Sequence, residues 1–218
     1  RDEDEWRDAW KRYFTTRRIG RIAIVPSWEA AAHTPLPGEV TLAMDPGRAF
    51  GTGGHATTRL CLRLIAELQA EPEFAAAAPL SILDIGCGCG VLAIAALLLW
   101  PAARVLGVDI DPEAIEVTAE NAERNGVADR LRAETTLVDE VPGQFALLLA
   151  NITGPTLLEL STAIAARLLP GGALILSGLL QTEAAAVKAR FFALGLRVLR
   201  DETEEEWAGL LLRQPAAH

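Results

Sequence analysis

Residues 81–90, SILDIGCGCG, combine a short apolar segment ending in Asp84 with three alternating glycines, Gly86, Gly88 and Gly90. The apolar run VLAIAALLLW follows, so the pattern predicts a strand, a glycine loop and a helix. Glycines permit backbone conformations and close approaches that a Cβ would block, and the free N–H groups of the helix point toward whatever lies over the loop. The stretch therefore predicts a site for a nucleotide-like ligand.

A second carboxylate completes the outline of a cofactor site. The next predicted strand, residues 105–108, ends in Asp109, which Ile110 and the pair Asp111-Pro112 follow. A carboxylate at the C-terminal end of a strand is well placed to accept hydrogen bonds from ribose hydroxyls.

The spacing of the glycines separates two kinds of cofactor. The dinucleotide fingerprint G-x-G-x-x-G/A, counted from Gly86, requires a small residue at position 91, where the chain has Val91. The observed order, Asp84 and then Gly86-x-Gly88-x-Gly90, resembles that of class I methyltransferases that use S-adenosylmethionine. The alternative is a glycine turn in a doubly wound fold that has lost its ligand.

A second glycine-rich segment, AFGTGGHATT at residues 49–58, ends in a histidine and two threonines. The threonines begin an amphipathic helical pattern. We expect this segment to close over a ligand on the first loop, with Thr58 offered to a carboxylate and His55 as a polar contact. The alternative is that Thr57 or Thr58 only caps the helix.

The strand predicted at residues 144–151, QFALLLAN, ends in Asn151. Ligands of open α/β sheets bind at this edge. Asn151 is therefore a candidate site residue.

Strand and helix patterns alternate regularly along the chain. Pro170-Gly171-Gly172 is predicted to end the helix that follows residue 155, and residues 196–199 and 207–212 are predicted to form an antiparallel pair around DETEEE. This order predicts an α/β fold with a doubly wound, mostly parallel sheet and helices on both faces.

The composition indicates a single soluble catalytic domain. A chain of 218 residues with 50% hydrophobic residues can build one sizeable core, and a formal net charge of -9 gives no support for non-specific nucleic-acid binding. Three cysteines without further ligands at metal spacing predict no metal site and a reducing cytoplasm. The apolar run at 91–100 is too short for a membrane span.

Five segments closely resemble the PrmA family, the bacterial methyltransferases of ribosomal protein L-eleven. They are AFGTGGHATT, LDIGCGCGVLAIAA, GVDIDPEAI, NAERNGV and LLLANI. The resemblance implies a seven-stranded, Rossmann-like class I methyltransferase fold, S-adenosylmethionine as donor, and protein amines (lysine side chains or an N-terminal amine) as acceptors. Ribosomal protein L-eleven is the partner that it implies.

The resemblance also implies roles for single residues. Thr58 matches the contact to the methionine end of the donor, Asp109 matches the acidic residue on the ribose, and Asn151 matches the asparagine beside the methyl group. Displacement at a sulfonium depends on positioning an amine lone pair more than on acid–base groups, and an amide oxygen can accept hydrogen bonds from that amine. With amines as the implied acceptors, Asn151 is the candidate catalytic residue. Trp207 resembles a late aromatic at the rim of the site, or is a core residue. The expected cofactor-binding residues are Phe50, Gly51, Thr52, His55, Thr58, Asp84, Gly86, Gly88, Gly90, Asp109, Ile110 and Asn151.

Family members carry an N-terminal substrate-recognition domain, which we expect to be absent from this chain. Residues 1–45 are then a linker helix and lead-in segment, and residues 46–218 the catalytic domain. Three alternatives stay open: another protein target, a small-molecule acceptor, or a non-catalytic module that only binds S-adenosylmethionine. A nucleic-acid acceptor is disfavoured because residues 151–154 lack the aromatic of base methyltransferases.

Overall fold

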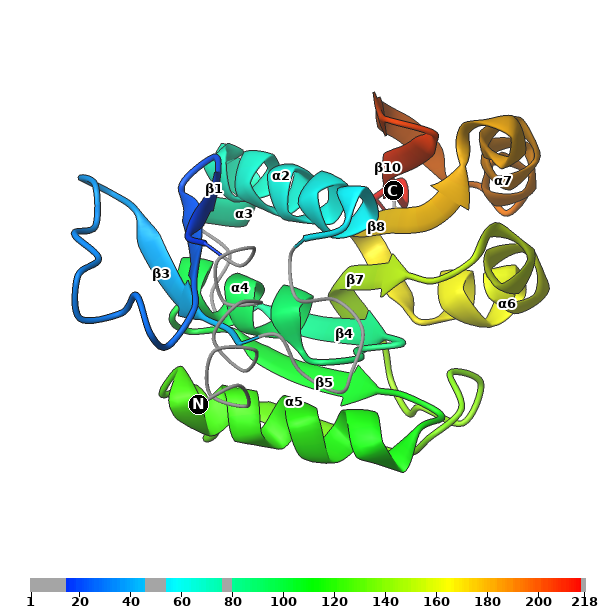
Figure 1. Ribbon diagram of the computed structural model, residues 1–218. Helices are drawn as coiled ribbons and strands as arrows, with labels where there is room; N and C mark the ends of the chain where they lie inside the picture. Colours follow the sequence, from blue (N-terminus) through cyan, green and yellow to red (C-terminus); the bar gives the residue numbers. More distant parts are fainter. Residues whose placement is uncertain (1–14, 46–53, 76–79, 217–218) are drawn as a thin grey trace, which may run out of the picture.

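The computed structural model describes residues 15–45, 54–75 and 80–216 (Figure 1). The helix expected near the start of the chain, at residues 2–14, lies outside these ranges, as do the expected cofactor residues Phe50, Gly51 and Thr52.

Seven strands form one sheet in the order β6-β5-β4-β7-β8-β10-β9. The first five strands in this order run parallel, and β10 is antiparallel to both of its neighbours. This confirms the predicted doubly wound, mostly parallel sheet with seven strands. The strands are β4 Ser81–Ile85, β5 Arg104–Val108, β6 Leu131–Glu134, β7 Phe145–Asn151, β8 Leu168–Leu180, β9 Arg197–Glu204 and β10 Trp207–Arg213.

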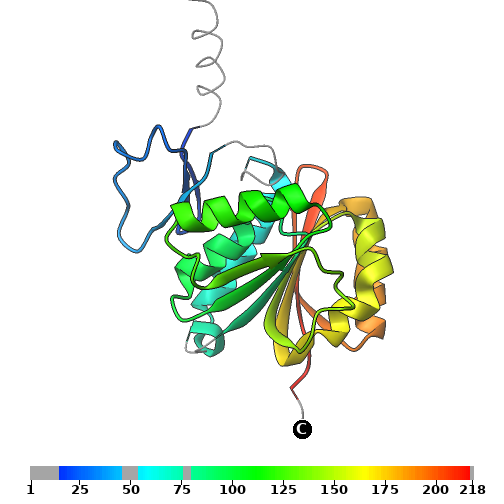
Figure 2. The same ribbon diagram turned by 90° about the horizontal axis from the view of Figure 1, so that it is seen from below.

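Helices cover both faces of this sheet (Figure 2). The central strands are apolar at nearly every position, because alternate side chains enter two different cores. Ile82 and Leu147 pack in the core with α2 and α4, whereas Leu83 and Leu148 pack in the core with α6 and α7. The helices are α2 Ala56–Ala70, α3 Pro72–Ala75, α4 Val91–Leu99, α5 Pro112–Arg124, α6 Gly154–Ala166 and α7 Gln181–Ala193.

The predicted end of α6 was wrong. The helix ends at Ala166, and Pro170-Gly171-Gly172 lies inside β8. The pairing of β7 with β8 shifts between Phe145 and Leu147, so a bulge absorbs the additional residues. Gly171 has a φ of 77°, and its N–H is bonded to the backbone after β10.

The acidic run DETEEE was also placed wrongly, between two strands. Its first four residues, 201–204, belong to β9, and only Glu205 and Glu206 form the turn to β10. Strand β9 is the edge of the sheet, and Glu202 and Glu204 form ion pairs with arginines of α2. Those pairs favour an extended conformation for residues that are otherwise poor strand formers.

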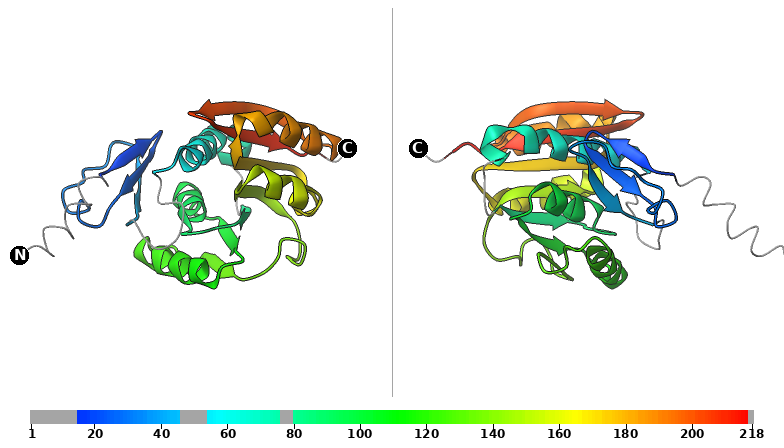
Figure 3. Two further views of the ribbon diagram at one scale, coloured as in Figure 1. Left: turned by 45° about the vertical axis from the view of Figure 1, so that its right-hand side comes forward. Right: turned by 90° about the vertical axis from the view of Figure 1, so that its left-hand side faces the viewer.

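A separate small sheet precedes α2 (Figure 3). It contains β1 Arg17–Ile19, β2 Ile22–Val25 and β3 Val40–Ala43, with β2 and β3 parallel. The Asn125 side chain at the end of α5 bonds both the N–H and the carbonyl of Ala43 at 2.8 Å. The division into residues 1–45 and 46–218 stays a prediction. None of the described helices has the length and apolar character of a membrane span.

Candidate functional site

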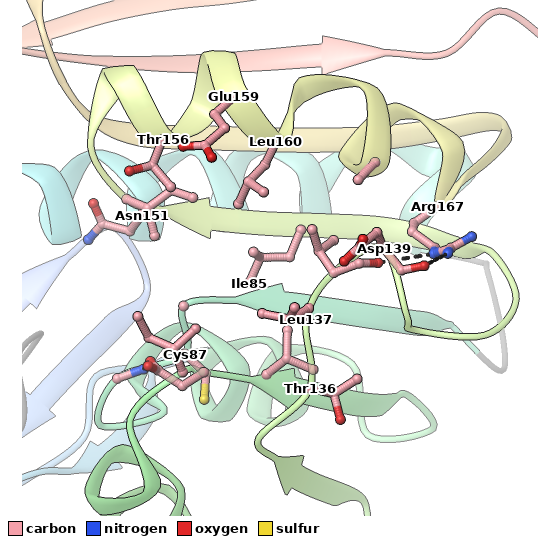
Figure 4. Close-up of a pocket in the computed structure, with 18 of the residues that line it drawn as sticks. Ile85, Cys87, Thr136, Leu137, Asp139, Asn151, Thr156, Glu159, Leu160 and Arg167 are labelled. Carbon is pink, nitrogen blue, oxygen red and sulfur yellow. Dashed lines mark hydrogen bonds between the residues drawn. The ribbon is translucent and has the colours of Figure 1, made fainter.

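A cavity of about 1040 Å³ lies at the C-terminal ends of β4, β5 and β7 (Figure 4). The loops that follow these strands form one side of it, and α6 together with residues 136–139 forms the other. This is the edge at which open α/β sheets bind their ligands.

The glycine loop between β4 and α4 has a backbone that side chains rarely permit. Gly86, Gly88 and Gly90 have φ values of 68°, 56° and 80°, all in the left-handed region. A Cβ at Gly86 would lie 2.5 Å from Cγ2 of Ile152. The loop therefore lies against the residue after β7, and Gly86 and Gly88 line the cavity.

Helix α5 holds this loop from behind. Thr118 Oγ1 donates to the carbonyl of Gly88, and Asn121 Nδ2 donates to the carbonyl of Cys89, both at 2.9 Å. Both side chains are buried, and these bonds satisfy two carbonyls of the loop. Sequence reasoning missed this role because it depends on two elements that meet only in the fold.

Asp84 lies beneath the loop and does not line the cavity. Its side chain is buried, and its Oδ2 accepts a hydrogen bond from the N–H of Ala93 at 3.2 Å. Burial, and to a smaller extent the nearby Asp109, raise the pKa of this carboxyl to about 7, although the hydrogen bond from Ala93 acts to lower it. The contact places Asp84 at the N-terminal turn of α4, where an acidic group is favourable.

Replacing Asp84 by Asn is expected to make the free energy of unfolding less dependent on pH. Folding raises this pKa from 3.8 to about 7, so the folded protein binds more protons between these values and loses stability as the pH rises through them. The amide has no such titration, and its oxygen can still accept from Ala93. Urea unfolding at about pH 4 and about pH 8 measures the difference, at most about 4 kcal/mol. An equal loss of unfolding free energy between the two pH values in the wild type and in Asp84→Asn would contradict this expectation.

Asp109 joins two loops at the mouth of the cavity. Its Oδ2 accepts from the N–H of Gly88 at 2.9 Å, and its Oδ1 accepts from the N–H of Asp111 at 3.0 Å. Beside it, Ile110 is 81% exposed, and Leu137 across the cavity is 53% exposed. Two exposed apolar side chains that line one cavity offer an apolar surface to a ligand.

Asn151 ends β7 and lines the cavity (Figure 4). Its Nδ2 donates to Oγ1 of the buried Thr58 at 3.4 Å. Its Oδ1 is buried and has no hydrogen-bond partner among the described residues. A buried acceptor without a partner is costly, so this oxygen suits a ligand that donates a hydrogen bond.

His55, rather than Thr57 or Thr58, is the N-cap of α2. Its Nδ1 accepts from the N–H of Thr57 at 3.4 Å and is 2.8 Å from Thr57 Oγ1. The ring lies edge-on to Trp207, with ring centroids 5.0 Å apart. The capping alternative for the threonines was therefore wrong.

The expected site residues divide into two described groups. Five line the cavity: Gly86, Gly88, Asp109, Ile110 and Asn151. Four lie outside its lining: His55, Thr58, Asp84 and Gly90. Their roles in cofactor binding stay predictions.

Sequence reasoning missed one wall of the cavity. One face of α6 and its C-cap lines it, through Thr156, Glu159, Leu160, Ala163 and Arg167. Arg167 donates from Nε to the carbonyl of Val138 at 3.2 Å and from Nη2 to that of Asp139 at 2.6 Å. It thereby ties the 136–139 loop to α6 (Figure 4). The helical spacing on α6 was the available signal.

The described residues contain no group of three or more His, Cys, Asp or Glu side chains arranged for a metal ion. Cys87 lines the cavity, and burial raises the pKa of its thiol to about 12. It is therefore protonated at neutral pH, the unreactive form of a cysteine.

Residues 1–215 match the family model described as "Ribosomal protein L11 methyltransferase (PrmA)". A protein of that name from Citrifermentans bemidjiense is 44% identical over 216 residues, which cover 99% of this chain and 68% of the relative. Another, from Pelobacter propionicus, is 41% identical over 215 residues, or 98% of this chain and 68% of that protein.

Two solved structures share the fold. A ribosomal protein L11 methylase from Lactobacillus delbrueckii subsp. bulgaricus superposes with a TM-score of 0.81 at 30% identity, over 93% of this chain and 100% of that one. An RNA methyltransferase from Salinibacter ruber, solved in complex with S-adenosyl-L-homocysteine, gives a TM-score of 0.54 at 18% identity. It covers 71% of this chain and 92% of its own, and shows the fold alone.

Proposed function

Because this chain belongs to the ribosomal protein L11 methyltransferase (PrmA) family, we propose that it transfers methyl groups from S-adenosylmethionine to amines of ribosomal protein L11. The observation that carries the proposal is the buried Oδ1 of Asn151, which has no hydrogen-bond partner in the described part of the chain, at a cavity bounded by a glycine loop and Asp109. We also propose that residues 46–218 form the catalytic domain and that residues 1–45 are a lead-in segment.

The residues around the cavity fit this donor. Its volume, about 1040 Å³, is at the upper end of ordinary ligand pockets. Gly86 and Gly88 allow close approach, Asp109 can accept from ribose hydroxyls, and the exposed Ile110 and Leu137 suit the flat face of a base. When bound, S-adenosylmethionine supplies a methyl group on a positively charged sulfur.

Asn151 would orient the acceptor amine. An N–H of the amine would donate to Oδ1, for which the described ranges offer no donor. Thr58, through its hydrogen bond with Nδ2, would keep the amide from rotating. With its amide fixed, Asn151 would hold the amine so that its lone pair points at the methyl group of the donor. This role needs no change in the ionisation of the asparagine.

The acceptor must be neutral when it reacts. A lysine amine with an ordinary pKa near 10.4 is mostly protonated at neutral pH. The cavity walls include Ile85, Val108, Leu137 and Leu160, and desolvation beside such side chains lowers the pKa of an amine. The released proton goes to water, and the overall charge of -9 favours approach of a cationic substrate.

Incubation of the protein with radiolabelled donor and purified ribosomal protein L11 tests the proposal. We expect label in L11, which mass mapping should place on lysine side chains or the N-terminal amine. Label on another protein of a lysate but not on L11 would contradict the proposal that L11 is the substrate. Donor binding without transfer to any acceptor would contradict the enzymatic function and indicate an interaction module.

Replacing Asp109 by Ala is expected to weaken donor binding by about 1.5–3 kcal/mol, the scale of hydrogen bonds to a charged group. Asp111→Ala is the matched control, because Asp111 caps α5 through the N–H of Glu113 and does not line the cavity. Titration calorimetry measures both affinities. If the Asp109→Ala variant bound the donor as tightly as the Asp111→Ala control, Asp109 would not be a donor-binding residue.

A further inference from the structure

The first turn of α2 contacts two parts of the fold that are far apart in sequence. Thr58 accepts a hydrogen bond from Asn151 at the end of β7, while His55 contacts Trp207 at the start of β10. Strand β8 separates β7 from β10 in the sheet. The position of this turn therefore determines where the Thr58 hydroxyl, which holds the Asn151 amide, lies.

Arg59 fixes this turn to the hairpin between β9 and β10. Its Nε lies 2.5 Å from Oε1 of Glu204, and its Nη2 lies 3.0 Å from Oε1 of Glu205. Its Nη1 donates to the carbonyl of Gly54, the residue before the N-cap His55. One guanidinium thus links two hairpin carboxylates to the backbone at which α2 begins.

The planar fork of arginine makes this arrangement possible. Its donors point in fixed, divergent directions, whereas a lysine presents one compact charge on a flexible stem. The Arg59 side chain is 20% exposed, so its bonds are partly shielded from water. Burial raises the pKa of Glu204, but hydrogen bonds from Arg59 and Arg63 outweigh this and keep the pKa below its usual value. Glu204 is therefore an ionised partner.

Arg63, one turn further along α2, provides an internal comparison. It pairs with the same hairpin, at 3.3 Å to Glu202 and 2.7 Å to Glu204. Both of these contacts are with carboxylates, whereas Arg59 also bonds a backbone carbonyl. Arg63 can therefore dock the helix without fixing its first turn.

We propose that Arg59 is a positioning residue for methyl transfer, acting on Asn151 through Thr58; this rests on the function proposed above. By bonding Gly54, Glu204 and Glu205 together, it fixes the turn in which Thr58 holds the Asn151 amide. Loss of Arg59 lets this turn move, so Asn151 no longer presents its Oδ1 in one orientation. Turnover falls, while the cavity residues that bind the donor keep their places.

Paired substitutions at Arg59 and Arg63 test this assignment. Arg59→Ala and Arg59→Lys should each lower kcat about tenfold, because small misplacements of a reacting group are costly. Donor Kd by calorimetry should rise by a smaller factor than kcat falls, because Gly86, Gly88 and Asp109 line the cavity and lie outside the turn. Arg63→Ala and Arg63→Lys should keep the wild-type kcat. Hydrogen exchange followed by mass spectrometry should show faster exchange in residues 54–60 in the Arg59 variants alone.

Three results would overturn the proposal. A folded Arg59→Ala protein with wild-type kcat and exchange would show that the residue positions nothing. Equal kcat losses at Arg59 and Arg63 would show that only docking of the helix matters. Full activity of Arg59→Lys would show that the fork is not required. Absence of methyl transfer by the wild type is a different result, which would overturn the proposed function, and the exchange comparison still tests whether Arg59 fixes the turn.

Discussion

Replacing Asn151 by Ala is expected to lower kcat for methylation of ribosomal protein L11 by about a hundredfold or more, the range found when one preorganised hydrogen-bonding group is removed from an active site. Donor Kd should change less than about threefold, because the other cavity residues are retained. The reason is geometric: Oδ1 is buried without a partner among the described residues, at the end of a strand that lines the cavity.

Thr58→Val is the matched variant for this experiment. Valine has the shape of threonine but cannot accept the hydrogen bond that Asn151 Nδ2 donates at 3.4 Å. Turnover should fall between the wild-type and Asn151→Ala values, since the oxygen is kept and only its orientation is lost. Steady-state kinetics and calorimetry measure both variants. If Asn151→Ala reduced turnover and donor affinity equally, Asn151 would be only a cofactor contact.

Replacing Gly178 by Ala is expected to lower the free energy of unfolding by about 2–5 kcal/mol, from backbone strain and overpacking together. Gly178 lies in β8 with a φ of 84°, and a Cβ there would be 2.4 Å from the carbonyl oxygen of Ile152 and 2.8 Å from its nitrogen. These are backbone atoms next to Asn151, so they can yield only if the candidate catalytic residue moves. Activity should therefore fall as well.

Gly171→Ala is the control for strain without collision. Gly171 lies in the same strand with a φ of 77°, but a Cβ there meets no atom of residues 15–45, 54–75 or 80–216 within 4 Å. Urea unfolding should show a smaller loss of about 1 kcal/mol, the lower end of the cost of a strained backbone. If Gly178→Ala were no less stable than Gly171→Ala, close packing of β8 against Ile152 would be refuted.

Ile152→Ala distinguishes the effects of the two glycine substitutions, Gly86→Ala and Gly178→Ala, whose new Cβ would clash with Ile152. A Cβ at Gly86 meets the Ile152 side chain, at 2.5 Å, whereas a Cβ at Gly178 meets the Ile152 backbone. Truncating Ile152 should therefore relieve part of the cost of Gly86→Ala and none of the cost of Gly178→Ala.

Local sequence patterns predicted much of this fold. The strand, glycine loop and helix at residues 81–99 depend on neighbouring residues, as do the strand that ends before Asp109 and the strand that ends in Asn151. The end of α6 could not be found in the same way. A proline and two glycines normally stop a helix, but here they form an irregular start of β8, supported by pairing with residues far along the chain.

The candidate site was predictable only in part, for the same physical reason. Gly86 and Asp109 directly follow strands and Asn151 ends one, and the C-terminal ends of parallel strands meet at one edge. The contact between Thr58 and Asn151 joins residues 93 positions apart, and Arg167 reaches across to the 136–139 loop. No local pattern encodes such pairs. The spacing on α6 indicates one face of a helix, but it does not show that this face borders the cavity.

A crystal structure of the protein with S-adenosylhomocysteine is the most direct test of the claim that this cavity binds the donor. We expect ligand density in the cavity, against Gly86 and Asp109 and beside Ile110 and Leu137. Density only elsewhere on the molecule, or a nicotinamide or flavin dinucleotide occupying the same cavity in its place, would contradict it.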